Sequence, residues 1–197
     1  SHENQMRQSL IPSLLQCRRQ NERHGTLNAE LFEIAKVYLS AGEGKLEADA
    51  EPTMVGIVSG RDFLSVKGIV EAIVARVAPN AKLTSEPSSL PEFGGGRGAE
   101  LSLNDRTFGW IGELDRAVTD KLDLQDGASV AELNANVLED LFEATRTYQP
   151  LPKFPVVSRD LNFVLKEATT WAELASTIAA AGGELLNETS FSGQYRG

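Results

Sequence analysis

Carboxylates are the side chains of this chain best suited to chemistry, because they can transfer protons and bind divalent metals. They occur in close pairs, Glu113 with Asp115 and Glu139 with Asp140. Directly adjacent acids, such as Glu139 and Asp140, would point to opposite faces of a strand, and we do not expect either pair to converge by spacing alone. With two histidines and one cysteine, no Ser/His/Asp or Cys/His set can be assembled. We therefore expect no catalytic residue and no metal ligand in this segment.

A glycine-rich run, Gly94–Gly98, could in principle hold a phosphate through its backbone N–H groups. A phosphate-binding loop of that kind needs a Lys-Ser/Thr pair and opens a helix, whereas this run leads into the strand-like Ala99–Leu103. The sequence favours a turn.

Composition limits the class of protein. The 197 residues carry a net charge of −9, which argues against binding driven mainly by phosphate neutralisation. No apolar run is long enough to span a bilayer, and we expect a cytoplasmic protein. The single cysteine, Cys17, excludes an intrachain disulfide. A local cluster of Arg7, Arg18, Arg19 and Arg23 leaves three interpretations open: RNA contact, subunit contact or a solvated helix face.

Periodicity predicts an α+β fold. Ser9 is a good N-cap for a helix with Pro12 in its first turn, and Asp62 can cap a second helix through Val77. Apolar alternation or short apolar runs predict the strands, which are Glu30–Leu39, Met54–Val58, Ala99–Leu103, Thr107–Leu114 and Val130–Asn134.

Three prolines between Tyr148 and Pro155 indicate an extended linker, so we divide the chain into residues 1–147 and 148–197. Beyond the linker, alternation predicts a strand over Arg159–Leu165. Thr170 can cap a helix, Trp171–Ala181, and Leu185–Tyr195 is predicted as a second strand. The order of elements in this tail is βαβ.

The order of motifs resembles the β chain of bacterial phenylalanyl-tRNA synthetase. The run from Met6 to Tyr38 is similar to the start of its synthetase-like module, and Asp62–Glu71 to a helix start of the pattern Asp-Phe-x-x-x-Lys-Gly-x-x-Glu. Trp110–Leu114 matches a Gly-x-Ile-Gly-Glu-Leu strand, and Leu151–Leu161 resembles the opening of the ferredoxin-fold anticodon-binding domain. There are departures: a His-Pro-Gly-Arg-Ser-Ala segment of the family stands here as Gly94–Ala99.

The resemblance implies a class II synthetase-like antiparallel sheet with helices, followed by a partial ferredoxin-like βαβ unit, within a longer β chain. It implies a non-catalytic scaffold of phenylalanine-tRNA ligase that packs against the catalytic α chain in a heterotetramer. In class II synthetases an Arg follows a Phe in motif 2, whereas Glu33 follows Phe32 here. ATP and Mg²⁺ are then used by the whole enzyme, with no cofactor in this segment.

By resemblance, Leu10, Leu14 and Arg18 are candidates for subunit contact, and membership of this module's own core is the alternative for the leucines. In the tail, Lys153, Arg159 and Arg196 would contact tRNA phosphates. A pairing of Arg159 with a nearby carboxylate is the alternative. Two other functions stay open, which are a stand-alone α+β module that binds a small ligand or RNA, and an enzyme with a carboxylate-built metal site.

Overall fold

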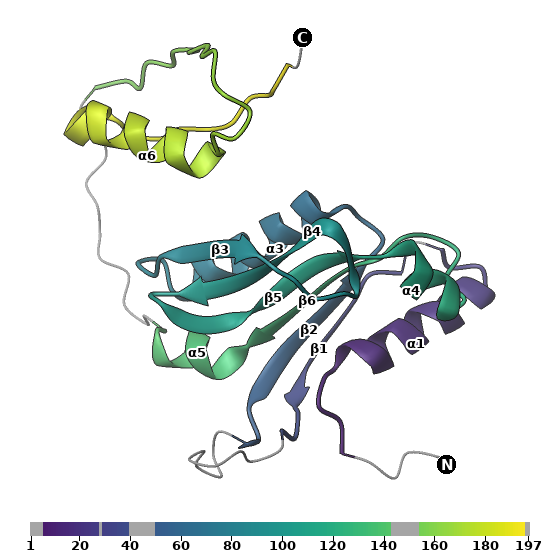
Figure 1. Cartoon of the computed structure of the whole chain (residues 1–197). Coiled ribbons are helices and arrows are strands. Elements are labelled where there is room, and N and C mark those ends of the chain that lie inside the picture. Colours follow the sequence, from purple (N-terminus) through teal and green to yellow (C-terminus); the bar gives the residue numbers. More distant parts are fainter. Residues whose placement is uncertain (1–5, 28, 40–49, 143–153, 196–197) are drawn as a thin grey trace. The chain divides into compact units, whose positions relative to one another are not determined.

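The computed structural model describes residues 6–27, 29–39, 50–142 and 154–195, and it divides the chain into two compact units, Ser1–Arg146 and Thr147–Gly197. The sequence predicts a division between residues 147 and 148. Each unit is described by itself below (Figure 1).

The first unit begins with helix α1, Ile11–Arg23. Pro12 lies in its first turn, where the missing N–H is harmless. Leu10 occupies the N-cap position, one residue after the predicted cap, Ser9. The Ser9 hydroxyl still accepts a hydrogen bond from the Ile11 amide, at 3.2 Å, so it satisfies one of the free donors at the start of the helix.

Six antiparallel strands form one sheet in the order β1-β2-β6-β5-β4-β3 (Figure 1). Strand β2 pairs with β6, which comes much later in the chain, with Ser59 opposite Ser129. The strands are β1 (Leu31–Lys36), β2 (Thr53–Ser59), β3 (Leu83–Pro87), β4 (Phe93–Leu103), β5 (Arg106–Leu114) and β6 (Ser129–Asn134).

The strands predicted in the first unit are present, with two differences. Strand β3 was not predicted. It ends at Pro87, a residue type that usually indicates a loop but is tolerated at a sheet edge. Strand β4 starts at Phe93 and includes the predicted turn Gly94–Gly98, with a register shift against β5 between Phe93 and Gly98. The Phe93 ring lies so close to Gly98 and Gly112 that a Cβ at either would come within 2.2 Å of it. These two glycines therefore make room for an aromatic ring.

Helices cover both faces of the sheet. On one face, α3 (Phe63–Val77) and α5 (Ala135–Asp140) pack on β2, β4, β5 and β6. The predicted cap of α3 is confirmed, because the Asp62 side chain accepts from the Ser65 amide at 2.8 Å. On the other face, α1 and α4 (Arg116–Lys121) pack on a second apolar cluster that includes Val58, Phe93 and Val130. Among the described helices, none is long and apolar enough to cross a membrane.

Two glycines, Gly56 on β2 and Gly60 just after it, set the distance between α1 and the sheet. A Cβ at Gly56 would lie 2.9 Å from Leu10 Cβ and 2.9 Å from Leu14 Cδ1. A Cβ at Gly60 would lie 3.1 Å from the Arg18 guanidinium. Helix α1 therefore lies closer to β2 than a residue with a Cβ atom at position 56 would allow.

The second unit contains one α-helix in its described part, α6 (Trp171–Gly182), followed by a 3₁₀ turn, η1 (Gly183–Leu185). The predicted cap is confirmed as a full capping box, because Thr170 and Glu173 exchange side-chain and backbone hydrogen bonds. The rings of Trp171 and Phe191 lie 5.5 Å apart and join the helix to the segment after it.

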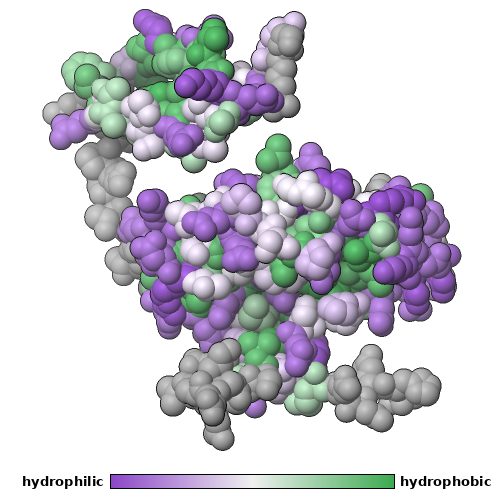
Figure 2. Space-filling view, in the orientation of Figure 1, coloured by the Kyte–Doolittle hydropathy of each residue, from purple (hydrophilic) through white to green (hydrophobic). Residues whose placement is uncertain are grey.

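The two strands predicted in this unit, Arg159–Leu165 and Leu185–Tyr195, are not formed. In a ferredoxin-like split βαβ unit another strand lies between the two, and the described residues of this unit supply none. Without it the two segments have no ladder to join. Their apolar side chains, among them Val164 and Phe163, stay exposed, and hydrophobic groups show on the surface of this unit (Figure 2).

We expect Gly56→Ala to lower the free energy of unfolding by about 1–3 kcal/mol, because the added methyl group overlaps Leu10 and Leu14. The matched control is Gly68→Ala on α3, where nothing lies within 4 Å of the added Cβ. That change should raise stability by up to about 1 kcal/mol through helix propensity. Urea denaturation measures both, and equal effects of the two changes would contradict the close approach of α1.

Candidate functional site

The residues predicted for subunit contact lie inside the first unit. Leu10, Leu14 and Arg18 are 0%, 6% and 0% exposed, and α1 directs all three toward β2. The alternative, that the two leucines belong to the module's own core, agrees with this placement. In this structure these side chains offer almost no surface to another chain.

Arg18 is held by a buried ion pair. Its Nε donates to Glu22 Oε1 at 2.9 Å, one turn along the helix, and both side chains are 1% exposed. Arg18 Nη2 donates to the carbonyl oxygen of Gly127 at 3.1 Å, and Glu22 Oε2 accepts from the Gln125 amide at 2.9 Å. This buried ion pair, with its two further hydrogen bonds, holds α1 against the segment around Gly127. The Arg18 guanidinium is therefore not available to a phosphate.

Glu132 on β6 holds the opposite end of α1. Its Oε1 accepts from the Leu10 amide at 2.7 Å and from the Ser9 hydroxyl at 3.0 Å. Burial raises the pKa of the Glu132 carboxyl, and the hydrogen bonds from Leu10 and Ser9 offset this only in part. The carboxylate thus binds the free donors at the helix N-terminus.

The predicted basic cluster is divided among separate ion pairs. Arg7 Nη1 lies 2.8 Å from Glu33, and Arg23 Nη2 lies 2.5 Å from Asp123, while Arg18 is buried. Four further arginines of the first unit are also paired with carboxylates, namely Arg61, Arg97, Arg106 and Arg116. Among the described arginines of this unit, Arg19 of the predicted cluster and Arg76 on α3 form no ion pair, so their charge is not neutralised by a carboxylate.

Of the residues predicted to contact tRNA, only Arg159 can be placed. Lys153 and Arg196 lie outside the described residues. Arg159 is exposed, and its Nη1 donates to the carbonyl oxygen of Ser158 at 3.1 Å. The structure therefore places one of the three residues, and their contact with tRNA stays a prediction.

The acidic pairs have structural roles. Glu113 accepts from Arg97 at 2.5 Å, Asp115 caps α4 by accepting from the Ala117 amide at 2.8 Å, and Asp140 accepts from Arg106 at 2.7 Å. Glu33, at the position compared with the motif 2 Arg, is paired with Arg7. Within the described ranges, no three His, Cys, Asp or Glu side chains form a group that could hold a metal ion.

A surface that the sequence did not single out lies on β1, at one edge of the sheet. The side chains of Phe32 and Ile34 are 73% and 60% exposed, although they stand opposite the buried Ile57 and Val55. The predicted alternation along this strand is confirmed, but the larger apolar residues of the strand face outward. We call Phe32 and Ile34 the β1 edge patch.

The backbone of the same two residues is unpaired on its outer side. Val37 N donates to Pro52 O and Leu39 N to Ala50 O, so odd-numbered residues in this register bond inward to β2. Phe32 and Ile34 therefore direct their N–H and C=O groups outward. Arg7 closes the edge just beyond them, because Arg7 O accepts from Tyr38 N at 2.8 Å and Arg7 Nε donates to Lys36 O at 2.9 Å.

Residues 1–135 match a family described as the CLM domain of the phenylalanyl tRNA synthetase beta chain. The chain belongs to this family. A phenylalanine–tRNA ligase beta subunit of Rhodopirellula baltica is 35% identical over 199 residues, which cover 97% of this chain and 29% of the relative. The beta subunit of Moorella thermoacetica is 32% identical over 205 residues, covering 98% of this chain and 25% of the relative. The chain thus spans about a quarter of the length of the β chains it matches.

Solved structures support the fold. A pyrrolysyl tRNA synthetase of Desulfitobacterium hafniense has a TM-score of 0.51 at 20% identity, over 68% of this chain and 47% of that one. A second structure of the enzyme from that organism gives 0.50 at 20% identity. The antiparallel sheet with helices on both faces is therefore the class II synthetase-like fold, as expected from the resemblance.

The Glu132→Gln variant should change how the stability of this β-chain module depends on pH. Because burial raises the Glu132 pKa above its ordinary 4.5, the folded chain binds this proton more tightly than the unfolded chain. Wild-type stability should therefore fall as pH rises from about 4.5 through the raised pKa, by at most about 1.4 kcal/mol per pH unit. The glutamine side chain of the variant can still accept a hydrogen bond from the Leu10 amide. Because an amide does not titrate, the stability of the variant should not fall in this way as pH rises. Urea denaturation between pH 4 and pH 8 measures the effect, and parallel profiles would contradict it.

Proposed function

We propose that this chain is a non-catalytic scaffold segment of phenylalanine-tRNA ligase, which attaches phenylalanine to its tRNA in the cytoplasm. The match of residues 1–135 to the CLM domain of the β chain carries this proposal. In the assembled enzyme the segment packs against the α chain and helps to present the tRNA.

The β1 edge patch is the surface that we propose for the α chain. It combines outward-facing backbone groups with two large exposed side chains at the same residues, Phe32 and Ile34. An added strand gains main-chain hydrogen bonds there, and each apolar side chain contributes about 1.5–3 kcal/mol if it becomes fully buried. The buried residues at the N-cap and within α1, which are Leu10, Leu14 and Arg18, would position β1 through the core and would not touch the partner.

The proposed division between a catalytic α chain and a non-catalytic segment also decides where ATP and Mg²⁺ would bind. Adenylate formation needs an Arg against the α-phosphate and carboxylates for Mg²⁺. The residue at the compared position is Glu33, whose carboxylate accepts from Arg7 at 2.8 Å, so this position offers no Arg to an α-phosphate. We propose that ATP and Mg²⁺ bind to the α chain, with no cofactor on this segment.

For tRNA, we propose a supporting role of the second unit through the exposed Arg159 together with Lys153 and Arg196. A net charge of −9 repels a polyanion at long range, so the segment alone should bind tRNA weakly. Local basic contacts of this kind position RNA and do not read its bases.

Ile34→Pro should prevent co-purification with the α chain. Proline removes an N–H that faces outward, so no hydrogen bond to β2 is lost, and edge strands tolerate proline there. Co-expression of the tagged chain with the α chain, followed by affinity capture, measures the amount of complex. We expect at least about a tenfold loss relative to wild type, the factor that corresponds to about 1.4 kcal/mol.

The matched control is Ser85→Pro on β3, the strand at the opposite edge of the sheet. It should leave the complex unchanged. Loss of the complex with Ser85→Pro and not with Ile34→Pro would place the α chain at the other edge. No complex with the wild-type chain would contradict the scaffold proposal itself.

Arg159→Glu in the full-length β chain, assembled with the α chain, should weaken tRNA binding about threefold to tenfold and lower the slope of log K against log salt by about 1. The control is Arg116→Glu on α4, an equal change of charge at an exposed position of the first unit. Filter binding at several salt concentrations measures both. An equal effect of the two variants would indicate only a general electrostatic contribution.

A further inference from the structure

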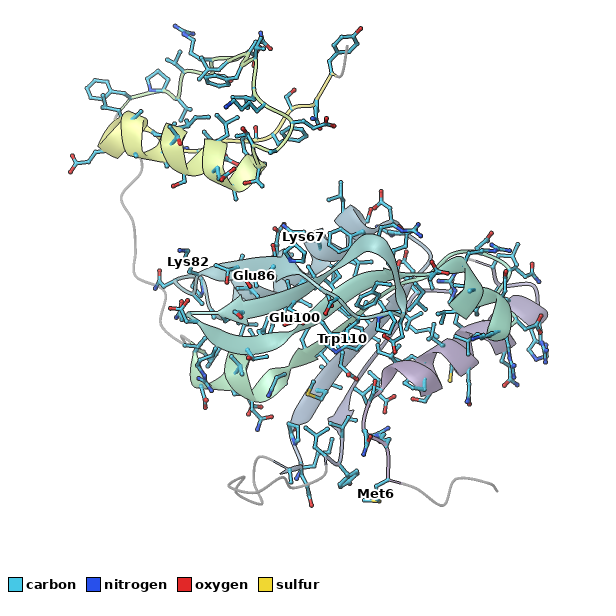
Figure 3. All side chains as sticks on the ribbon, in the orientation of Figure 1. Met6, Lys67, Lys82, Glu86, Glu100 and Trp110 are labelled. Atoms are coloured by element: carbon cyan, nitrogen blue, oxygen red, sulfur yellow. The ribbon has the colours of Figure 1, made fainter. Side chains whose placement is uncertain are left out.

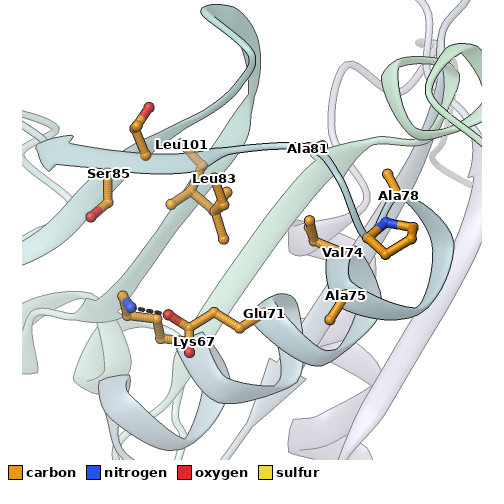
Figure 4. A pocket seen from close by; sticks show the side chains of 11 residues that line it. Lys67, Glu71, Val74, Ala75, Ala78, Ala81, Leu83, Ser85 and Leu101 are labelled. Carbon is orange, nitrogen blue, oxygen red and sulfur yellow. Dashed lines mark hydrogen bonds and ion pairs between the residues drawn. The ribbon is translucent and has the colours of Figure 1, made fainter. Parts of the chain in front are cut away.

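A groove runs between helix α3 and the edge strand β3 in the first unit (Figure 4). Its volume is about 230 Å³, below the 300 to 1,000 Å³ typical of drug-sized ligands but large enough for an aliphatic side chain. The groove has an apolar floor and small residues along the helix, and the ion pair of Lys67 with Glu71 lies on its rim. The floor and walls include Val74, Ala75, Ala78, Leu83, Ser85 and Leu101.

Strand β3 has an unpaired edge beside this groove. Asn104 N donates to Lys82 O and Ser88 N to Gly98 O, so even-numbered residues bond inward to β4. Leu83 and Ser85 therefore direct N–H and C=O groups outward. Pro87, the next outward residue, has no N–H, so two donors remain on this edge. The residues with outward backbone groups are the same ones whose side chains line the groove.

The opposite face of β3 carries a polar hollow of about 200 Å³. Two of its residues, Glu86 on β3 and Glu100 on β4, stand directly opposite each other in the strand register and lie on neighbouring strands (Figure 3). Like charges in this arrangement destabilise a sheet. Within the part of the chain that the structure describes, neither forms an ion pair. These two carboxylates are therefore not paired with a cation, although Lys82 stands just before the start of the strand.

We propose that the β3 edge binds an extended segment of a partner protein in which apolar residues alternate with Lys or Arg. Such a segment, added as a seventh strand, bonds to the backbone of Leu83 and Ser85. Because side chains alternate across a strand, its apolar residues enter the groove below α3 while its basic residues lie beside Glu86 and Glu100. One ligand thus satisfies the apolar groove, the unpaired backbone edge and the opposed carboxylates.

The probe is a synthetic seven-residue peptide in which lysine alternates with valine, labelled at one end with fluorescein. The control peptide has the same composition with its lysines and valines in separate blocks, so that it cannot place them on opposite faces. Fluorescence anisotropy with the full 197-residue chain measures the dissociation constants. We expect the alternating peptide to bind at least about tenfold more tightly and to weaken with added salt. Equal binding of the two peptides would overturn the proposal.

Variants then locate the site. Ser85→Pro removes one outward donor and should weaken the alternating peptide about tenfold, while Ile34→Pro at the β1 edge should have no effect. Glu86→Gln together with Glu100→Gln should reduce both the affinity and its salt dependence. Ala75→Phe, at an exposed position of α3, fills the groove and tests the site without altering β3. Loss of binding with Ile34→Pro, or full binding by Ala75→Phe, would overturn the assignment. The outcome is independent of the α chain, which we place at β1.

Discussion

Helix α1 lies against strand β2 at a distance that only glycine permits, and the arrangement of one whole face of the sheet depends on this contact. Gly56 lies under Leu10 and Leu14, and Gly60 lies under Arg18. The helix is fixed in its middle by apolar packing and at its ends by carboxylates, Glu132 at the N-terminus and Glu22 near the C-terminus. Because removal of one partner from a buried ion pair leaves an uncompensated charge, α1 cannot shift along β2 without a large cost. The second apolar cluster, with Phe93 and Val130, forms around a helix held in this way.

Within the described residues of the first unit, two buried side-chain atoms, Arg18 Nη1 and Ser129 Oγ, lack a hydrogen-bond partner. The surfaces with capacity for contact lie at the two edges of the sheet. The edges differ in chemistry. At β1 the exposed groups are the large side chains of Phe32 and Ile34, and Arg7 closes the edge beyond them. At β3 the apolar residues are recessed in a groove, acids lie on the other face, and Pro87 limits the pairing. The two ligands that we propose would therefore not compete for one surface.

Much of the first unit was predictable from the sequence, because local signals and tertiary packing agree there. Asp62 caps its helix where expected, and the alternation from Leu31 to Lys36 gives a strand. The sequence did not reveal which face of β1 is buried, because the same alternation fits burial of either face. The buried face depends on how far α3 extends over the sheet, which is a tertiary feature. Strand β3 was missed since Pro87 indicates a loop unless the strand is known to be an edge. In the tail, alternation predicted strands that need a neighbouring strand to form, and a strand pattern does not show whether that neighbour is present.

The pairing of β2 with β6 has a consequence for the way in which the chain reaches its fold during synthesis. Ser59 and Ser129, which face each other across this pairing, are separated by the whole of α3 and the β3-β4-β5 meander. A ribosome adds about 5 to 20 residues per second, so β1 and β2 wait on the order of ten seconds for the strand that completes their sheet. The meander, with its short connections, can fold during that interval, because closing short loops costs little entropy. During this interval the apolar faces of β1 and β2 stay exposed on the nascent chain, and exposed surface of this kind promotes aggregation.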